Sequence, residues 1–517
     1  MQAMNMVPRV LAAVLSCALA SSAQGGYLVV ALDLPAADAA CAGFRTAVEA
    51  VRTFHKADLF EWDGRDFERL AGACRERQPA NVLFVLRPAS LDLVLHRRIL
   101  LQAAKVDADP CVDFAFGYLT AESGDDCVAL WRRIEGLHRK GTLSGLWWQA
   151  SVCSADKSFR YPAGAASIQS AAGFQDPHHY FANRDPGRMR AVEAALDELG
   201  EAQVAEFTGC GDPQGIWLFD DDRNKERDKH WDYAPDKVGH DPDGAMPRLL
   251  ASRFRSLPLA APIVWSGTCH SGAVERVFVE GDIVATFGRT TRATVHRLAV
   301  ADSLALAWLH AGAAALLVPL GANHGLAVSN ETDFALEHGA SLGEVLKATW
   351  DDVFLAAGGE LELDLPVEGE PHRHGEKVMQ GGGANRILIG DPALRPFRAV
   401  PHPRETTNAE SLDGGLRVTV ARADGFVARG WDMYGDSRPN DWRVAARVDV
   451  SKLGVEGVSF TAEVAATGVD GRSLPYTVTR CVVEQWHGKR LLHLQANGRR
   501  AQVENQAVTA VFTVRRS

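Results

Sequence analysis

The sequence predicts an α/β protein in which a parallel β-sheet, flanked by helices and built in two subdomains, is followed by a small all-β domain. Short apolar runs alternate with amphipathic segments between residues 27 and 139, a similar alternation returns between residues 203 and 389, and helical patterns vanish after about Pro403. A chain of 517 residues, 46% of them hydrophobic and 23% charged, is long enough for several globular domains with large cores.

The first region contains four apolar runs typical of buried strands, at residues 27–32, 57–62, 81–86 and 112–119. Helical periodicity between and after them predicts helices at residues 38–55, 66–77, 91–106 and 125–139. Strands that alternate with helices of this length indicate a parallel sheet with helices on both of its faces.

The second region is less regular. We expect strands at residues 203–207, 216–219, 262–265, 282–287, 313–319 and 386–389, and helices at residues 188–199, 248–257, 304–310 and 341–355. Residues 143–187 show no clear period, and we expect an irregular connector or an active-site wall there. Residues 220–247 are polar and densely charged, which predicts a long loop of the kind that is usually functional or mobile.

After Pro403, six segments alternate apolar and polar residues, at 416–421, 442–450, 458–465, 476–484, 490–495 and 507–514. Turn signals such as Asn497-Gly498 separate several of them, which predicts a small antiparallel sandwich. The expected organisation is a signal peptide at residues 1–23, an N-terminal α/β subdomain at 24–139, a second α/β subdomain of catalytic type at 140–402, and a β-sandwich domain at 403–517.

The N-terminus has the features of a secretory signal peptide. Arg9 precedes an apolar run at residues 10–20 that is too short to span a bilayer, and Ser21-Ser22-Ala23 offers a cleavage site. We therefore expect an exported protein, in the periplasm, at the cell surface or outside the cell, with no membrane span. A lipid anchor at Cys17 is the alternative. The net charge of −10 argues against nucleic acid or an anionic membrane as the main partner.

The stretch from Pro262 to Gly272, which reads PIVWSGTCHSG, holds the main candidate for chemistry. A short apolar strand closes on small residues and glycines that allow a sharp turn, and Cys269 lies at that turn. Ligands of open α/β sheets bind at the carboxyl ends of the strands, so Cys269 is a candidate nucleophile; the alternative is a small buried side chain. The cysteines after Cys17 are dispersed without a CxxC pair, which argues against a structural zinc site and leaves room for one or two disulfides.

This arrangement resembles the gingipain-like cysteine peptidases, relatives of the caspases. The resemblance rests on Cys269 at its strand end, on Gly390-Asp391-Pro392, and on the strand at residues 113–119, where Tyr118 stands in place of the family's usual arginine. It implies two α/β subdomains followed by an immunoglobulin-like sandwich. It also implies a cysteine endopeptidase that acts on a peptide or protein substrate and requires no cofactor, although calcium often accompanies the fold.

A thiol nucleophile needs a histidine that takes its proton and later protonates the leaving amine, and two N–H donors for the oxyanion. The resemblance places that histidine in a Gly-His-Gly turn, which corresponds here to Gly209-Cys210-Gly211 after the strand at 203–207. Cys210 cannot act as an imidazole base. His240, which lies 29 residues before Cys269 (269 − 240 = 29), His324 at the next strand end, and the adjacent His270 are the possible substitutes. Gly211 and Cys269 would donate the two N–H groups.

Three alternatives stay open at this point. Cys210 and Cys269 end neighbouring predicted strands, and a disulfide or redox pair between them would silence a peptidase. Loss of the usual histidine also suits a non-catalytic relative that acts as a binding or interaction module. Finally, the oxygen ligands of Asp220-Asp221-Asp222 are of the type that calcium prefers, although a charge run is usually a solvated face.

Overall fold

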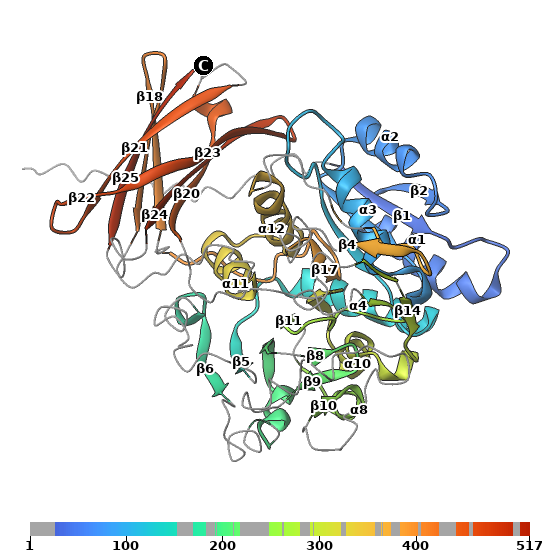
Figure 1. The fold of residues 1–517 in the computed structure, drawn as a ribbon. Coiled ribbons are helices and arrows are strands. Elements are labelled where there is room, and N and C mark those ends of the chain that lie inside the picture. The colour runs from blue at the N-terminus through green and yellow to red at the C-terminus, as the bar shows by residue number, and fades with distance from the viewer. Residues whose placement is uncertain are drawn as a thin grey trace, which may run out of the picture.

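The structure, a computed structural model, describes residues 26–151, 169–181, 192, 194–209, 211–217, 248–260, 263–279, 290–292, 294–321, 327–356, 363, 365–373, 383–401, 405–422, 441–453, 459–499 and 507–516. Its centre is a ten-stranded sheet in the order β2-β1-β3-β4-β17-β15-β11-β7-β5-β6, and a separate all-β unit follows it in the chain (Figure 1). The predicted fold class, a parallel-dominated α/β sheet with a C-terminal all-β region, is confirmed.

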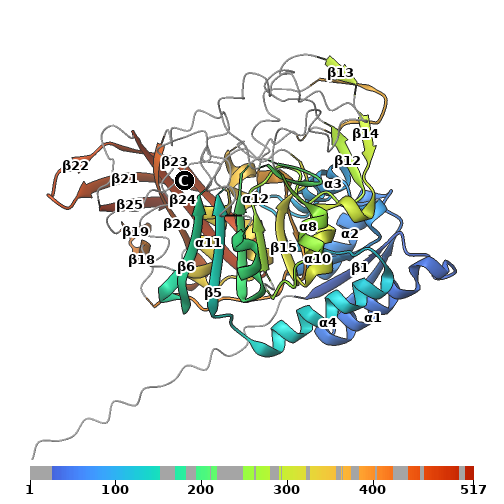
Figure 2. The same ribbon diagram turned by 90° about the horizontal axis from the view of Figure 1, so that it is seen from below.

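The N-terminal half of the sheet matches the predicted elements closely. Its strands are β1 (Tyr27–Leu32), β2 (Asp58–Trp62), β3 (Asn81–Val85) and β4 (Ala115–Leu119), all mutually parallel. Its helices are α1 (Ala42–His55), α2 (Phe67–Arg77), α3 (Leu93–Ala103) and α4 (Gly124–Lys140). Figure 2 shows α1 and α4 side by side below β1, with α2 and α3 on the other side of the strand, as right-handed crossovers require.

Local sequence signals set the ends of these helices. The Asp66 side chain accepts a hydrogen bond from the Arg69 N–H at the start of α2, and the Ser123 side chain accepts one from the Asp126 N–H at the start of α4. The α1 and α4 helices approach closely at a pair of glycines, since a Cβ placed on Gly43 would lie 2.6 Å from the Gly124 Cα. The contact lets two helix backbones pack against each other over the sheet.

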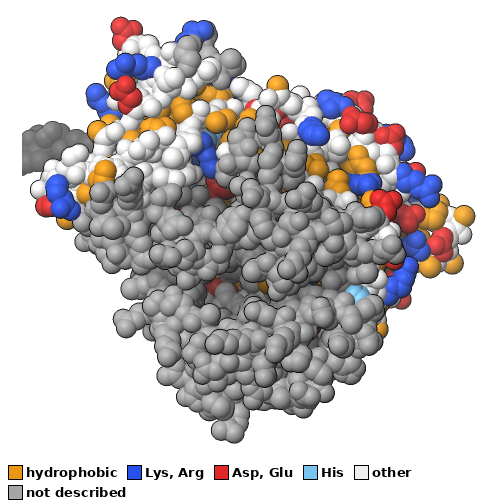
Figure 3. Space-filling view, viewed as in Figure 1, with side chains coloured by type: hydrophobic (Ala, Val, Ile, Leu, Met, Phe, Trp, Pro, Cys, Tyr) orange, Lys and Arg blue, Asp and Glu red, His pale blue; other side chains and the backbone are white. Residues whose placement is uncertain are grey.

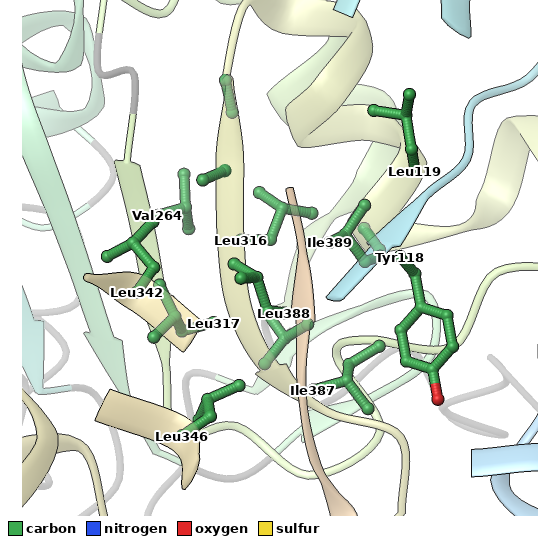
Figure 4. Close-up of a cluster of buried hydrophobic side chains, with 14 of the residues drawn as sticks. Tyr118, Leu119, Val264, Leu316, Leu317, Leu342, Leu346, Ile387, Leu388 and Ile389 are labelled. Carbon is green, nitrogen blue, oxygen red and sulfur yellow. The ribbon is translucent and has the colours of Figure 1, made fainter. Parts of the chain in front are cut away.

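The second half of the sheet contains β5 (Gly145–Ser151), β6 (Phe174–Phe181), β7 (Ala202–Thr208), β11 (Ile263–Ser266) and β15 (Ala315–Pro319), which run parallel to one another. β17 (Arg386–Ile389) runs antiparallel to β15 and connects the two halves, because Ile389 also pairs with Tyr118 of β4. Figure 4 shows the apolar side chains of β4, β11, β15 and β17 meeting those of α12 in one core.

The expectation of an irregular segment at residues 143–187 is wrong in part, because β5 and β6 lie within it. β5 reads GLWWQAS and gives no clean alternation, since Trp147 and Trp148 are both fully buried on opposite faces of the sheet. β6 forms the end of the sheet and contains Pro177, a residue that strands tolerate mainly at an edge. The predicted strand at 282–287 lies outside the described residues, and so do residues 188–191 and 193 of the predicted helix at 188–199. The described end of that segment is helical and closes in a short 3-10 helix, Leu196–Gly200.

Shorter elements complete the α/β region. The helices are α8 (Ala251–Arg255), α10 (Leu304–Ala311), α11 (Ala327–His338) and α12 (Leu342–Ala356). Small antiparallel sheets are formed by β8 (Gly211–Asp212), β9 (Gly215–Trp217) and β10 (Arg248–Leu250), by β12 (Arg276–Val279) with β14 (Thr294–Arg297), and by β13 (Thr290–Arg292) with β16 (Pro371–Arg373). None of the described helices is long and apolar enough to cross a membrane.

All six strands predicted after Pro403 are present, together with two that were not predicted, the eight-residue β18 and the two-residue β22. One sheet has the order β18-β19-β25-β21-β22 and the other the order β20-β24-β23. Their bounds are β18 (Glu405–Leu412), β19 (Gly415–Arg422), β20 (Asp441–Asp449), β21 (Phe460–Gly468), β22 (Ser473–Leu474), β23 (Tyr476–Trp486), β24 (Lys489–Arg499) and β25 (Val508–Arg516). This unit has its own hydrophobic core, separate from the core of residues 28–400.

A buried charge network joins the all-β unit to the α/β region. Lys347 of α12 pairs with Asp351 at 2.7 Å and with Glu484 of β23, and all three side chains are almost fully buried. At the margin of this contact, Arg480 pairs with Asp352 at 2.6 Å.

On the described part of the face in Figure 3, basic and acidic side chains are interspersed rather than separated.

Candidate active site

Cys269 lies at the carboxyl end of a central strand. β11 is flanked by β7 and β15 and is completely buried, and the chain turns immediately after Ser266. Cys269 is half-buried. The structure therefore places the sequence-predicted nucleophile at the strand edge where open α/β sheets bind ligands.

Backbone hydrogen bonds fix this turn to the ends of both neighbouring strands. The Gly267 N–H donates to the Phe207 carbonyl of β7 at 2.8 Å. On the other side, the Gly272 N–H donates to the Pro319 carbonyl of β15 at 2.8 Å, and the His270 N–H donates to the Gly321 carbonyl at 2.9 Å. Cys269 is thus carried on a turn that is tied on two sides.

The backbone of the turn is strained at the residue that follows the thiol. His270 has a φ of +57°, in the left-handed region, and its side chain is buried. Such a conformation costs about 1–3 kcal/mol and persists only where surrounding contacts enforce it, as they commonly do at functional sites. Inside the turn, Ser266 Oγ accepts hydrogen bonds from the Thr268 N–H at 3.1 Å and from the Ser271 hydroxyl at 3.0 Å.

The glycine turn after β7 lies against the Cys269 turn. Gly211 is buried, and a Cβ placed on it would lie 2.2 Å from Cγ2 of Thr268 and 2.6 Å from the Gly215 carbonyl oxygen. Only glycine fits this contact. The structure thus brings together two of the sequence-predicted site residues, Gly211 and Cys269, on neighbouring strand ends.

Two threonine hydroxyls at the same strand ends are unsatisfied. Thr208 Oγ1 ends β7 and Thr268 Oγ1 precedes Cys269, and among the described residues neither atom has a hydrogen-bond partner although both atoms are buried. Buried polar atoms of this kind are rare in folded proteins and are commonly satisfied by water or by a ligand. These two hydroxyl groups therefore add polar atoms to the edge of the sheet that carries Cys269.

A buried ion pair that sequence reasoning missed contacts the end of β11, directly before the Cys269 turn. Arg386, the first residue of β17, forms a two-point pair with Glu331 of α11, with N–O distances of 2.9 and 2.5 Å, and both side chains are completely buried. The Arg386 guanidinium also donates to the Ser266 carbonyl at the end of β11. Glu331 in turn accepts the Trp265 indole N–H at 2.8 Å. The sequence signal for this ion pair was Arg386 itself, a charged residue at the start of an apolar run, 386–389, that predicts a buried strand.

Cys269 differs from most other cysteines of the described chain in its exposure. Cys74 and Cys127 are buried, and burial raises the pKa of both thiols, that of Cys74 to about 12. Cys481, in the all-β unit, is half-buried like Cys269, but burial raises its pKa to about 11. Buried thiols of raised pKa are chemically inert, and Cys269 is set apart from the buried cysteines by its exposure and its position at a strand end.

Of the three histidines predicted as a possible base, His240 and His324 lie outside the described residues, whereas His270 is described and is buried directly after Cys269. Cys210 and the acidic run at 220–222, with its predicted calcium ligands, also lie outside the described residues. Roles for these undescribed residues therefore stay predictions.

Two groups of described side chains could hold a metal ion, and both lie away from Cys269. One joins His55, His138 and Asp391, and the other joins Cys111, Glu484 and His493 at the contact with the all-β unit. A separate cavity of about 350 Å³ opens beyond the carboxyl ends of β1 and β3, between Asp33, Asp92 and Arg276.

Comparison with known proteins gives structural similarity only. No family model matches the sequence, and no curated protein matches it. A complex of the pro- and mature domains of RgpB from Porphyromonas gingivalis is similar over 91% of this chain and 93% of that chain, at 12% identity and a TM-score of 0.43. A structure described as a protease covers 92% of each chain at 11% identity and a TM-score of 0.41. The Saccharomyces cerevisiae separase–securin complex covers 60% of this chain and 16% of that chain, at 10% identity and a TM-score of 0.28. Function therefore has to be inferred from the residues of the site.

Proposed function

We propose that this protein is an exported cysteine endopeptidase of gingipain-like type that cleaves peptide bonds in peptide or protein substrates. The observation that supports this most is the position of Cys269, on a strained turn tied to β7 and β15 at the carboxyl end of a central strand. The packing of Gly211 against Thr268 adds a second backbone segment beside that turn. The signal-peptide features of the N-terminus support export.

In the proposed reaction the Cys269 sulfur adds to the scissile carbonyl carbon, and its proton passes to a histidine. The backbone N–H groups of Gly211 and Cys269 stabilise the oxyanion of the tetrahedral intermediate. Collapse of the intermediate expels the amine, which takes the proton from the histidine and leaves a thioester. Water, deprotonated by the same histidine, then hydrolyses the thioester and restores the thiol.

His240 and His324 remain the two candidates for that histidine. The sequence separation from Cys269 favours His240. The structure supplies an argument for His324, because three peptide units join it to Gly321, whose carbonyl accepts the His270 N–H beside Cys269. Separate His240→Ala and His324→Ala variants would identify the base, since its loss should lower kcat by about 10²-fold or more while the other variant stays close to wild type.

The test of the proposal is turnover of a mixed peptide library by the mature protein under mild reductant. Cleavage should be present in wild type, absent in Cys269→Ala, and unchanged in Cys481→Ser, which removes a thiol of similar exposure far from the site. Equal cleavage by Cys269→Ala would mean that the activity belongs to another group or to a contaminant, and it would contradict the proposal.

A second candidate function is that of a non-catalytic binding module, and the Gly209-Cys210-Gly211 turn favours it because the family's usual histidine is absent. Under this alternative, folded and reduced wild-type protein cleaves nothing in the library, whereas Cys210→His gains activity. Activity that appears only after reduction would instead support the disulfide or redox pair between Cys210 and Cys269.

A further inference from the structure

Three metal-binding side chains from distant parts of the chain converge on one point. Asp391 Oδ2 lies 2.7 Å from His55 Nε2 and 2.7 Å from His138 Nε2, and the ligand atoms of all three residues lie within 4.8 Å of one another. The residues are separated by up to 336 positions in sequence. Their convergence is therefore a product of the fold.

The fold brings these residues to the edge of the sheet opposite Cys269. β17 runs antiparallel to β15, with Ile389 opposite Leu316, so the chain leaves β17 at the amino end of β15 and places Asp391 there. His55 is the last residue of α1, and His138 lies in the last turn of α4, the helix that packs beside α1 (Figure 2). Helices that follow parallel strands run back to this edge, so their last turns meet it.

The carboxylate is held in place by a second set of contacts. Asp391 is completely buried, and its Oδ1 accepts hydrogen bonds from the Tyr27 hydroxyl at 2.7 Å and from the Ala393 N–H at 2.9 Å. The Tyr27 ring also stacks on the His55 ring, with centroids 4.0 Å apart. Such outer contacts are typical of metal sites, where they orient the ligands and fix their chemistry. They direct Oδ2 toward the two imidazoles.

We propose that Asp391, His55 and His138 form a binding site for a divalent transition-metal ion of the zinc type. Two imidazole nitrogens and one carboxylate oxygen are a donor set that zinc accepts, at about 2.0–2.2 Å from each atom. The side chains of His55 and His138 are 11% and 16% exposed, so water can reach the fourth position. Tetrahedral coordination would move the ligand atoms from 2.7 Å to about 3.3 Å apart, a shift of about half an ångström.

The ion would act as a clip between three segments. α1, α4 and the turn after β17 are held at this point by hydrogen bonds, and a bound ion would replace the two N–H···O contacts with three coordinate bonds. Each imidazole would present its Nε2 lone pair, with the proton on Nδ1. A site of this kind stabilises the folded chain because the unfolded chain does not preserve it.

The test uses mature Cys269→Ala protein, which removes the half-buried thiol that could bind zinc at the other edge. Titration with zinc alone should show one equivalent bound at neutral pH and raise Tm by about 2 °C or more at a large excess over Kd. Cobalt(II) should give visible bands typical of tetrahedral nitrogen and oxygen ligands, without the near-ultraviolet band of a thiolate ligand. That spectrum separates this site from the group that contains Cys111.

Variants assign the ion to its ligands. His55→Gln with His138→Gln should abolish the cobalt spectrum and the zinc-dependent Tm shift, whereas His310→Gln, an exposed histidine on α10, should leave both unchanged. If the double variant does not fold, His138→Gln alone should weaken zinc binding by about tenfold or more. The proposal is overturned if the Cys269→Ala protein, with His55, His138 and Asp391 intact, binds no zinc. It is also overturned if zinc affinity and the cobalt spectrum are unchanged in the histidine variants.

Discussion

Gly211 packs so closely against Thr268 that a Cβ placed on it would lie 2.2 Å from the threonine Cγ2. This contact joins the turn after β7 to the turn that carries Cys269. It explains why a glycine is required at position 211, independently of any role of its N–H in catalysis. The two turns therefore form one structural unit, and a change in either should be felt at Cys269.

Gly211→Ala should disturb both stability and activity. The methyl group would meet Thr268 and the Gly215 carbonyl, and overpacking of this kind costs about 1–3 kcal/mol of unfolding free energy. Displacement of the Cys269 turn should also lower kcat/KM by about tenfold or more. Gly136→Ala is the matched control, because an added Cβ there meets nothing within 4 Å and a helix gains stability from alanine. Wild-type stability and activity in Gly211→Ala would contradict the contact.

The Arg386–Glu331 pair should be essential for the same turn. Glu331→Gln leaves a buried guanidinium without its counter-charge, which should lower the free energy of unfolding by about 3–5 kcal/mol in urea denaturation. Glu410→Gln, which breaks an exposed pair with Arg417, should cost less than about 1 kcal/mol. The double variant Arg386→Met with Glu331→Leu should lose less stability than the sum of its single variants, because no buried charge is left unpaired. Additive losses would show that the two side chains act independently.

Asp113 should make stability depend on pH near neutrality. Burial, followed by the nearby charge of Asp107, raises the pKa of Asp113 to about 8, well above the value of about 3.9 for an unfolded chain. A raised carboxyl pKa means that the folded state holds a proton which the unfolded state releases. The contribution of Asp113 to the free energy of unfolding is therefore fully present below about pH 4 and is lost as the pH rises toward 8.

Asp113→Asn removes that ionisation and should be more stable than wild type at pH 8, with the difference shrinking as the pH falls to about 5. Urea denaturation of both proteins across this range measures it. A constant difference at every pH would mean that the asparagine acts through packing or hydrogen bonding instead of through the proton.

Much of the fold was accessible from the sequence, for identifiable reasons. Apolar runs such as residues 27–32 and 81–86 are buried strands with helices of clear period between them, and the alternation after Pro403 matched the observed strands. β5 and β6 were missed because Trp147 and Trp148 are buried on both faces and because Pro177 argues against a strand.

The site was accessible only in part. Cys269 and Gly211 could be predicted because strand ends and glycine turns mark them in the sequence. The Arg386–Glu331 support and the convergence of His55, His138 and Asp391 depend on pairings across long stretches of chain, and no local pattern encodes them. In the sequence, Asp391 stands out only as part of Gly390-Asp391-Pro392. The two features that bear on metal binding, the spacing of the cysteines and the acidic loop, do not include His55 or His138.

The most direct test of the central claim is the rate at which iodoacetamide alkylates Cys269 at pH 6, measured by peptide mass spectrometry against Cys481 in the same sample. An activated thiolate reacts at a pH where ordinary thiols are protonated, and burial keeps the pKa of Cys481 near 11. We predict that Cys269 reacts at least about tenfold faster than Cys481. This difference in rate should be lost in one of the two variants His240→Ala and His324→Ala, the one that removes the base. Equal or slower reaction of Cys269 would contradict its role as an activated nucleophile.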